Sequence, residues 1–259
     1  MATQITTELI KQLRDSTGIS VMQCKKALEE AMGDMEKAIL ILKKTSSDIA
    51  LKKLDREAKD GAVSIKGDGK KAVLVALHCE TDFVSRNEDF TNLLQTLTEK
   101  ALKEGIDKMK EGAKDLIDPI IQKTGENIQL GDVYEVDGEV LGTYIHNHKS
   151  GVIVSLTGGS SDIARDVAMH ITAMKPEYID SSEINEDTKK SVNELFEKEV
   201  ANIDKPEDIK KKMLEGKINT YFKEKTLLDQ PFIKNGDETV GKLLERSGAK
   251  IKEVKRYSI

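Results

Sequence analysis

Four side chains that could carry chemistry lie close together in the sequence. They are His78, Cys79, Glu80 and Asp82, and they follow the apolar run 72–77. Because alternate residues of a strand face opposite sides, His78 and Cys79 cannot both point at one site without a bulge. The spacing matches no zinc pattern, and no second Cys or His pair supports one. The cluster therefore does not favour a metal site.

A catalytic cysteine would need a histidine base brought from elsewhere in the chain. Beyond the adjacent His78, only His146, His148 and His170 could act as the base for Cys79. No convincing catalytic constellation emerges, so we expect a protein that performs no bond chemistry and holds neither a metal nor a cofactor. A small cytosolic enzyme that uses His78 and Cys79 remains an alternative.

The turn that follows, Thr81-Asp82-Phe83-Val84, places a large aromatic side chain between polar neighbours. Residue types alone leave two interpretations open. In the first, Asp82 caps the next helix and Phe83 folds back on it as a hydrophobic staple. In the second, Phe83 is a wedge for a partner's pocket, because a rigid aromatic on a short loop loses little entropy on binding.

Composition narrows the classes of partner. The 259 residues carry a formal net charge of −5, with 41 Lys and Arg against 46 Asp and Glu. That balance argues against a general electrostatic grip on nucleic acid. No apolar run approaches the roughly 20 residues of a membrane span, and the two cysteines lie far apart without a secretory leader. We therefore expect a soluble, cytoplasmic protein that binds neither nucleic acid nor membranes.

Hydrophobic patterning divides the chain into four parts. Residues 1–44 show three short apolar helix faces, and the charged segment 45–61 is expected to be a connector. Residues 62–124 and 125–259 each contain strands, a polar break and a helix. Within the last part, two charged helices at about 183–226 predict an antiparallel coiled-coil hairpin that projects from the body. The predicted fold class is α+β, with antiparallel sheets in a two-part core.

Strand pairing is predicted at several places. The glycine-flanked turn 67–69 predicts a β-hairpin between the strands on either side. Residues 128–136, 140–146 and 152–156 are expected to form a three-strand meander. The segment 230–233 and the last strand of the chain are expected to join that second sheet.

Three details of the helices can also be tested. Pro119 should start or kink its helix rather than sit inside it. Val21 is expected on the core face of the second helix, together with Cys24 and Leu28. The apolar seam predicted for the helical hairpin consists of Val192, Leu195, Phe196, Val200, Met213, Leu214, Ile218 and Phe222.

A series of short motifs runs in order through the chain. They are Leu13-Arg14, Thr17-Gly18, Cys24-Lys25-Lys26-Ala27-Leu28, Gly33-Asp34, Thr81-Asp82-Phe83-Val84, Gly125-Glu126-Asn127-Ile128, Tyr144-Ile145-His146, Gly151-Val152, Met169-His170, Lys175-Pro176-Glu177, Gln230-Pro231-Phe232, and Thr239-Val240-Gly241 with Leu243-Leu244. In their order and spacing they resemble the bacterial elongation factor Ts family, the guanine-nucleotide exchange factors of elongation factor Tu. The resemblance covers nearly the whole chain.

The resemblance implies a ubiquitin-associated-like N-terminal module of three helices, a two-part α+β core and a protruding coiled-coil hairpin. It implies a translation elongation factor, not an enzyme, that binds elongation factor Tu in its GDP-bound and nucleotide-free forms and promotes GDP release. Asp82 and Phe83, flanked by Thr81 and Val84, would reach the nucleotide-binding domain of that partner and displace the magnesium that bridges GDP. Homodimerisation is left open.

Three further points bear on the partner surface. The small residue pair that is usual in the family after Thr-Gly is replaced here by Ile19-Ser20, which would alter a loop facing the partner. A coiled-coil scaffold that binds proteins through the helical hairpin stays a competing interpretation. The additional partner contacts that the resemblance implies are Arg14, Thr17, Gly18 and His146.

Overall fold

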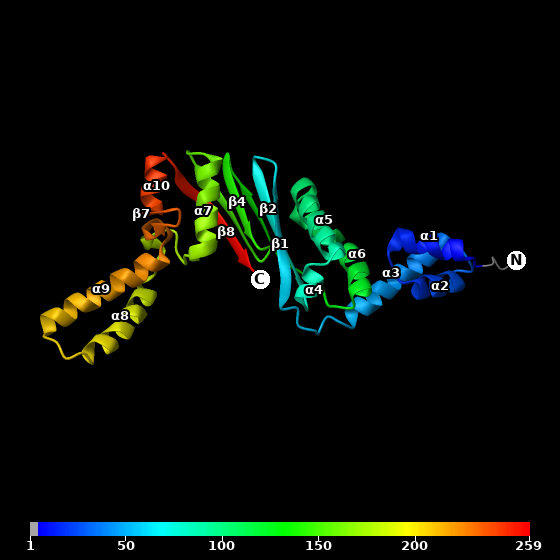
Figure 1. The fold of residues 1–259 in the computed structure, drawn as a ribbon, viewed down its shortest axis with the longest axis horizontal. Coiled ribbons are helices and arrows are strands. Elements are labelled where there is room, and N and C mark those ends of the chain that lie inside the picture. The colour runs from blue at the N-terminus through cyan, green and yellow to red at the C-terminus, as the bar shows by residue number, and fades with distance from the viewer. Residues whose placement is uncertain (1–4) are drawn as a thin grey trace. The chain divides into compact units, whose positions relative to one another are not determined.

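The computed structural model describes residues 5–259, which divide into two compact units (Figure 1). Unit 1 contains the described residues up to Val136 together with Ile145–Gly151 and Lys255–Ile259, and unit 2 contains Asp137–Tyr144 and Val152–Val254. Helices and small antiparallel sheets make up both units, so the predicted α+β class is confirmed. Across residues 5–259, no helix is long and apolar enough to cross a membrane.

Unit 1 begins with α1 (Thr7–Thr17), α2 (Val21–Glu30) and α3 (Met35–Leu51). The first four residues of the predicted range 1–44 lie outside the described residues. Each helix starts at a side chain that accepts a hydrogen bond from a first-turn amide, which satisfies a backbone donor left over at the helix end. These caps are Thr6, Ser20 and Asp34. The helices enclose a small core of Leu13, Ile19, Cys24, Ala27, Leu28, Ala31, Ala38 and Leu42.

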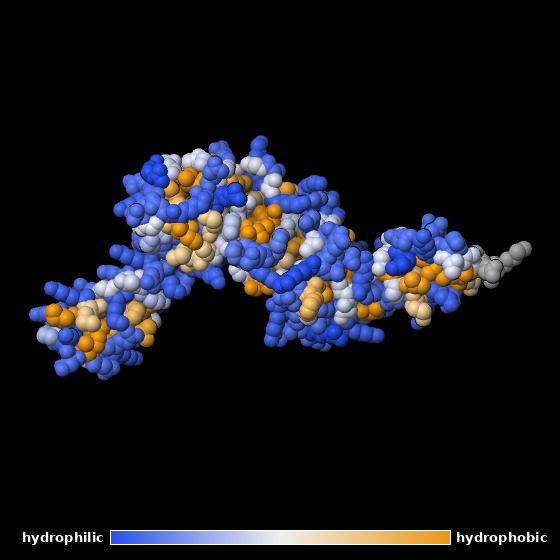
Figure 2. Space-filling view, in the orientation of Figure 1, coloured by the Kyte–Doolittle hydropathy of each residue, from blue (hydrophilic) through white to orange (hydrophobic). Residues whose placement is uncertain are grey.

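The exposed side of these helices carries apolar residues. Met22 is 78% exposed and Met32 is 77% exposed, and Figure 2 shows apolar patches on this part of unit 1. Val21, which was predicted to face the core, is 49% exposed. Ile19 is the buried residue instead, because it precedes the Ser20 cap and turns inward. Where the family usually has a small residue pair, this chain has Ile19-Ser20, and the large side chain of Ile19 lies inside the module rather than on its surface.

Helix α3 continues to Leu51, past the boundary expected at residue 44. Its buried residues follow one stripe, Ala38, Leu42, Ser46 and Ala50, and the second half of that stripe packs on α6. The first part of the expected connector is therefore helix.

The strands β1 (Asp60–Gly67) and β2 (Lys71–Cys79) form the predicted hairpin, which is confirmed. Their antiparallel register pairs Asp60 with Cys79 at the open end of the hairpin. Every residue of β2 from Ala72 to Leu77 is buried. Both faces of β2 are therefore covered, and both of its edges are paired, because it lies between β1 and β3.

The predicted three-strand meander is wrong. Strand β3 (Gln129–Asp137) joins β2, whereas β4 (Val140–His146) pairs with β5 (Ser150–Thr157), which pairs in turn with β8 (Lys250–Ser258). The reason is that buried backbone N–H and C=O groups need hydrogen-bond partners. Strand β1 pairs with only one edge of the buried strand β2, and β3 pairs with the other edge. The last strand does join the second sheet, as predicted.

Three helices lie between β2 and β3 in the sequence. They are α4 (Asp82–Ser85), α5 (Glu88–Glu104) and α6 (Ile106–Thr124). Helix α5 packs on β1 and β2, and α6 packs on α5 and α3. Pro119 sits inside α6, contrary to the prediction, because Ile117 and Ile121 on either side of it are buried in the core and hold the helix together.

Unit 2 has its own core beneath α7 (Ser161–Met174) and α10 (Val240–Arg246). Helix α7 lies so close to the sheet that a Cβ on Gly142 of β4 would meet the Ala164 carbonyl carbon at 2.1 Å. The segment expected at 230–233 forms no part of this sheet. It contributes β6 (Pro231–Phe232) to a separate two-stranded ribbon with β7 (Asn235–Thr239), because the chain turns back between Phe232 and Asn235, which pair with each other.

The helices α8 (Glu186–Ala201) and α9 (Glu207–Lys225) form the helical hairpin of unit 2 (Figure 1). Val192 and Val200 are buried between them, as predicted. Leu195, which was also predicted to lie in the seam, is 54% exposed. The apolar stripe of α8 is therefore narrower than the sequence indicated.

Candidate functional site

The turn Thr81–Val84 connects the buried strand β2 to the first turn of helix. Thr81 is extended, with φ −132° and ψ 159°, and α4 then makes a single turn before Asn87 caps α5. Figure 1 shows α4 beside the end of the β1–β2 hairpin. A short helix wedged between a strand and a long helix has little freedom in its backbone path.

Phe83 points into solvent from this turn. Its side chain is 84% exposed, whereas Val84 is only 9% exposed and belongs to the core that also holds Phe90. Consecutive residues of a helical turn point in different directions, so burying Val84 turns Phe83 outward. The interpretation in which Phe83 folds back as a hydrophobic staple is therefore wrong.

Asp82 does not cap the helix either. The N-cap position of α4 is Thr81, and its side chain accepts no hydrogen bond from a helix amide. The Asp82 carboxylate pairs with Arg86 at 3.1 Å. Both side chains are largely in water, where such a pair contributes only about 0.3–0.5 kcal/mol. Asp82 is therefore held weakly and can exchange its partner.

The backbone just before Phe83 is held by a carboxylate from another part of the chain. Glu126 Oε2 accepts hydrogen bonds from the amides of Glu80 at 3.1 Å and Thr81 at 3.0 Å. Glu126 Oε1 accepts a third hydrogen bond, from the Thr81 hydroxyl at 2.6 Å. Charge-assisted bonds of this kind are shorter and stronger than neutral ones.

The contact is reciprocal. The Asn127 amide donates to Glu80 Oε1 at 2.6 Å, and Arg56 pairs with the same carboxylate oxygen at 3.5 Å. Gly125, which ends α6 with φ 76°, turns the chain so that Glu126 and Asn127 face the end of β2. The two segments, 80–81 and 125–127, thus hold each other through both of their backbones.

The two chemically suggestive residues at the end of β2 have structural partners. His78 Nε2 lies 2.7 Å from the Tyr257 hydroxyl, and the Cys79 thiol donates to the Thr81 carbonyl at 3.2 Å. Burial raises the pKa of Cys79 to about 12, and the nearby carboxylates of Asp60 and Glu126 add to the shift. A nucleophilic thiolate is not available there near neutral pH. Within residues 5–259, no group of three or more His, Cys, Asp or Glu side chains could hold a metal ion.

His146 lies next to the turn between β4 and β5, whose residues Asn147 and His148 both have positive φ values, 49° and 56°. Lys149 anchors this turn to the first sheet: its Nζ donates to Asp60 Oδ1 and the Gly61 carbonyl, both at 2.6 Å. The same ammonium lies 3.3 Å from the hydroxyl of Ser85 in α4. The structure therefore brings the turn beside His146 close to the turn that carries Phe83.

A cleft of about 760 Å³ lies between these two turns, within unit 1. Arg86 and Gln95 line it on the side of α4 and α5, and His148 and Lys149 line it on the other side. No carboxylate is among its lining residues, although acids outnumber bases in the chain as a whole. Both of its cations are paired with carboxylates just outside the lining, Arg86 with Asp82 and Lys149 with Asp60.

Arg14, Thr17 and Gly18 lie at the end of α1. Thr17 turns its hydroxyl back to the Leu13 carbonyl at 2.6 Å, and Gly18 ends the helix with φ 65°. A Cβ on Gly18 would meet the Lys123 ammonium at 2.3 Å.

Lys123 links this helix end to the candidate site. Its ammonium pairs with Asp89 in the first turn of α5 at 3.1 Å. The end of α1 therefore sits over the start of the helix that follows Thr81–Val84. Arg14 and Gly18 are exposed. They lie in the same unit as Phe83, near the start of α5.

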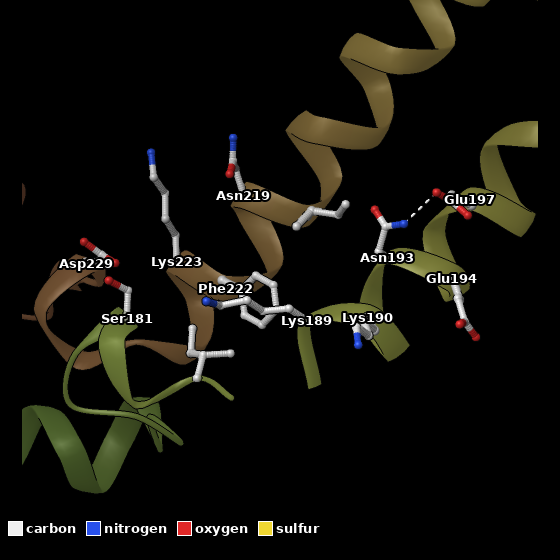
Figure 3. A pocket seen from close by; sticks show the side chains of 12 residues that line it. Ser181, Lys189, Lys190, Asn193, Glu194, Glu197, Asn219, Phe222, Lys223 and Asp229 are labelled. Atoms are coloured by element: carbon white, nitrogen blue, oxygen red, sulfur yellow. Dashed lines mark hydrogen bonds between the residues drawn. The ribbon is translucent and has the colours of Figure 1, made fainter. Parts of the chain in front are cut away.

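Unit 2 has a separate groove of about 800 Å³ at the base of the helical hairpin (Figure 3). Phe222 forms part of it, and the side chains of Lys223 and Asn219 point the same way from α9. Asn193 and Glu197 on α8 are joined by a hydrogen bond of 2.6 Å. Its charged lining residues are of both signs, so the groove has no clear preference for one kind of ligand.

Sequence reasoning identified the turn Thr81–Val84 but missed the residues that hold it. Glu126 lies in one of the motifs on which the resemblance rests, yet no role was predicted for it. Its partners are Glu80 and Thr81, about 45 residues earlier in the chain. No local pattern could have joined them, and the same is true of Lys149 and Asp60.

The fold is that of an α+β protein, and the candidate site is a firmly held turn with one protruding aromatic, Phe83. Residues 80–259 match the family described as Elongation factor TS. The chain is 36% identical over 265 residues to elongation factor Ts of Pseudomonas aeruginosa (strain LESB58), an alignment that covers 99% of this chain and 91% of that protein.

Two other relatives agree. Elongation factor Ts of Hahella chejuensis is 36% identical over 262 residues, covering 98% of this chain and 92% of that protein. Elongation factor Ts of Thioalkalivibrio sulfidiphilus is 37% identical over 269 residues, with the same coverage. The chain belongs to the elongation factor Ts family, and this assigns it to translation elongation.

Proposed function

We propose that this chain binds elongation factor Tu, in its GDP-bound and nucleotide-free forms, and promotes the release of GDP. The observation that carries the proposal is Phe83, a large aromatic that is 84% exposed on a turn held by Glu126. Translation elongation takes place in the cytoplasm, and the proposed site of action is there. The chain makes and breaks no bond in this reaction.

The mechanism is thermodynamic linkage between two ligands of elongation factor Tu. If this chain prefers the conformation that lacks nucleotide and magnesium, each ligand weakens the binding of the other by the same factor. Phe83 would enter the nucleotide-binding domain as a wedge, and Asp82 would lie beside the bound magnesium that is displaced. The weak pair between Asp82 and Arg86 leaves the Asp82 carboxylate available for this role.

The size of the effect can be estimated. Burying one Phe side chain fully contributes about 1.5–3 kcal/mol, which corresponds to roughly ten- to hundredfold in affinity for the distorted state. This is too little for the whole of nucleotide displacement, so other contacts must share it. Thr81 and Val84 support the wedge from below, because one is bonded to Glu126 and the other is buried in the core.

Two neighbouring surfaces are proposed as the additional contacts. One is the β4–β5 turn with His146, which borders the cleft lined by cations and without carboxylates. The other is the end of α1 with Arg14, Thr17 and Gly18, which sits over the start of α5 through Lys123. Both would extend the contact around Phe83 within unit 1.

The test is the release of fluorescent GDP from purified elongation factor Tu. With the double variant Asp82→Ala, Phe83→Ala, the rate of GDP release should be at least about tenfold lower than with the unsubstituted chain, because the wedge is lost. The control is Ile233→Ala in unit 2, which removes another apolar side chain, one that is 46% exposed. It should accelerate GDP release from elongation factor Tu as much as the unsubstituted chain does. Equal acceleration by the double variant would overturn the wedge.

A further inference from the structure

We propose that Glu126 is a positioning residue for nucleotide exchange: it sets the orientation of the Thr81–Val84 turn so that Phe83 is presented to the partner. The inference rests on the proposed function and deepens it. Glu126 itself lies behind the turn and acts through the backbone of residues 80 and 81.

Phe83 depends on its backbone for its orientation. A buried side chain is held by its neighbours, but Phe83 is 84% exposed and has no place in any of the three cores. Its direction is therefore set by the residues before and after it. Val84 fixes the following side of the turn by its burial, and the preceding side is fixed by Glu126.

The hydrogen bonds of Glu126 are well suited to this task. One oxygen accepts from two consecutive amides, those of Glu80 and Thr81, and the other accepts from the Thr81 hydroxyl. Fixing two peptide units in a row leaves little freedom for rotation between them. The N-cap side chain of Thr81 makes no hydrogen bond to the helix, whereas the Glu126 carboxylate binds the amides of Glu80 and Thr81 just before the helix begins.

The segment that holds the turn also holds the chain leaving α3. The Asn127 side-chain amide donates to the Arg56 carbonyl at 2.6 Å, and the Lys53 ammonium donates to the Gly125 carbonyl. Residues 125–127 thus support both the turn that carries Phe83 and the connection to the N-terminal helices.

Loss of Glu126 should loosen the turn without unfolding the unit. Cys79, Val84 and Phe90 stay in the core on both sides of the turn and make no use of the Glu126 carboxylate for their packing. The effect of Glu126 should therefore appear in the exchange reaction more than in stability.

The experiment is a double-mutant cycle on the release of fluorescent GDP from elongation factor Tu, at saturating concentrations of each variant. Glu126→Ala should slow release about tenfold in the otherwise unsubstituted chain. In the Phe83→Ala background the same substitution should have no further effect, because a residue that acts through Phe83 has nothing left to position. Equal slowing in both backgrounds would overturn the inference.

A conservative variant separates positioning from a general loss of structure. In Glu126→Gln the amide oxygen can accept from the two backbone amides, and the amide nitrogen can donate to the Thr81 hydroxyl. This variant should release GDP at nearly the unsubstituted rate, and a loss as large as that of Glu126→Ala would contradict the assigned geometry. Circular dichroism and a thermal melt establish that each variant is folded.

Thr81→Val keeps the inference testable if Glu126→Ala does not fold. It removes the hydroxyl that donates to Glu126 Oε1 and retains the side-chain shape. A smaller slowing that again disappears in the Phe83→Ala background is expected, and slowing that persists there would overturn the inference.

The outcome is separable from that of the proposed function. If Phe83→Ala alone releases GDP as fast as the unsubstituted chain, the wedge itself fails. If Phe83→Ala slows release but Glu126→Ala leaves it unchanged, only the positioning role of Glu126 fails.

Discussion

The turn that carries Phe83 and the helical hairpin α8–α9 both expose apolar side chains, but they hold them differently. Around Phe83, Glu126 and the buried Val84 fix the backbone on both sides. On the hairpin, Leu195 is exposed from a helix that is joined to its neighbour by a narrow apolar seam. Surface ion pairs such as Lys217 with Glu199 at 2.8 Å add little to that seam.

Exposure alone therefore does not indicate a contact residue. Exposed single apolar side chains are common on protein surfaces and need no explanation. Phe83 differs because hydrogen bonds to Glu126, in a distant segment, fix the backbone that carries it. Leu195 is exposed because the apolar stripe of its helix is too narrow to bury it.

The largest expected effect on stability concerns the hairpin. Val200 is 3% exposed between α8 and α9, so Val200→Asp buries an unpaired charge and should destabilise the hairpin by about 3 kcal/mol. Chemical denaturation followed by circular dichroism measures this. The control Leu195→Asp lies on the same helix at a position that is 54% exposed and should change stability by less than about 0.5 kcal/mol.

The same pair of variants tests the scaffold alternative. If the turn around Phe83 is the main contact, Val200→Asp should still capture elongation factor Tu from solution and accelerate GDP release. Loss of all capture by Val200→Asp, with capture kept by Leu195→Asp, would assign binding to the hairpin instead.

A smaller effect separates the two units by their response to acid. In unit 2, His170 Nε2 donates to Gln230 Oε1 at 2.9 Å, and its Nδ1 accepts from the Ile233 amide at 3.2 Å. The bond at Nδ1 needs the neutral ring, and burial lowers the pKa of His170 below its ordinary value of 6.5, although the hydrogen bond to Gln230 opposes this shift. The unfolded chain therefore takes up a proton before the folded one does.

This sign fixes the direction of the pH effect. The stabilisation is fully present above about pH 6.5 and is lost as the pH falls through the folded pKa of His170, by at most about 1.4 kcal/mol per pH unit. In unit 1, burial opposes ionisation of Asp60, but hydrogen bonds from Lys149 and Ser85 keep the pKa of Asp60 below its ordinary value of 3.8. That contribution is lost only in stronger acid.

As the pH is lowered from 7 to 5, unit 2 should therefore lose stability before unit 1. Hydrogen exchange of the backbone amides in each unit measures this loss. His170→Gln, which cannot titrate, should remove most of this pH dependence. A slope that is the same in this variant would show that other groups are responsible.

Much of the fold followed from local patterns in the sequence. The β1–β2 hairpin was predicted from the glycines around Asp68, and the N-terminal helices from their apolar spacing. The pairing of β3 was missed because a strand's partner depends on which edges are left unsatisfied elsewhere. Pro119 was misplaced because tertiary packing on both sides overrides its local preference.

The candidate site was predictable only in part. The residue types around Phe83 left its direction open, and the resemblance singled out the turn without explaining how it is held. The burial of Val84, which turns Phe83 outward, and the reach of Glu126 to Thr81 both depend on contacts between distant segments. Such contacts have no signature in a single sequence.

The central claim is that Phe83 distinguishes the two states of elongation factor Tu. The most direct test is the affinity of this chain for elongation factor Tu, measured by titration calorimetry with nucleotide-free partner and again with GDP and magnesium. Phe83→Ala should weaken binding to the nucleotide-free form and so narrow the ratio of the two affinities by roughly ten- to hundredfold. An unchanged ratio would contradict the account.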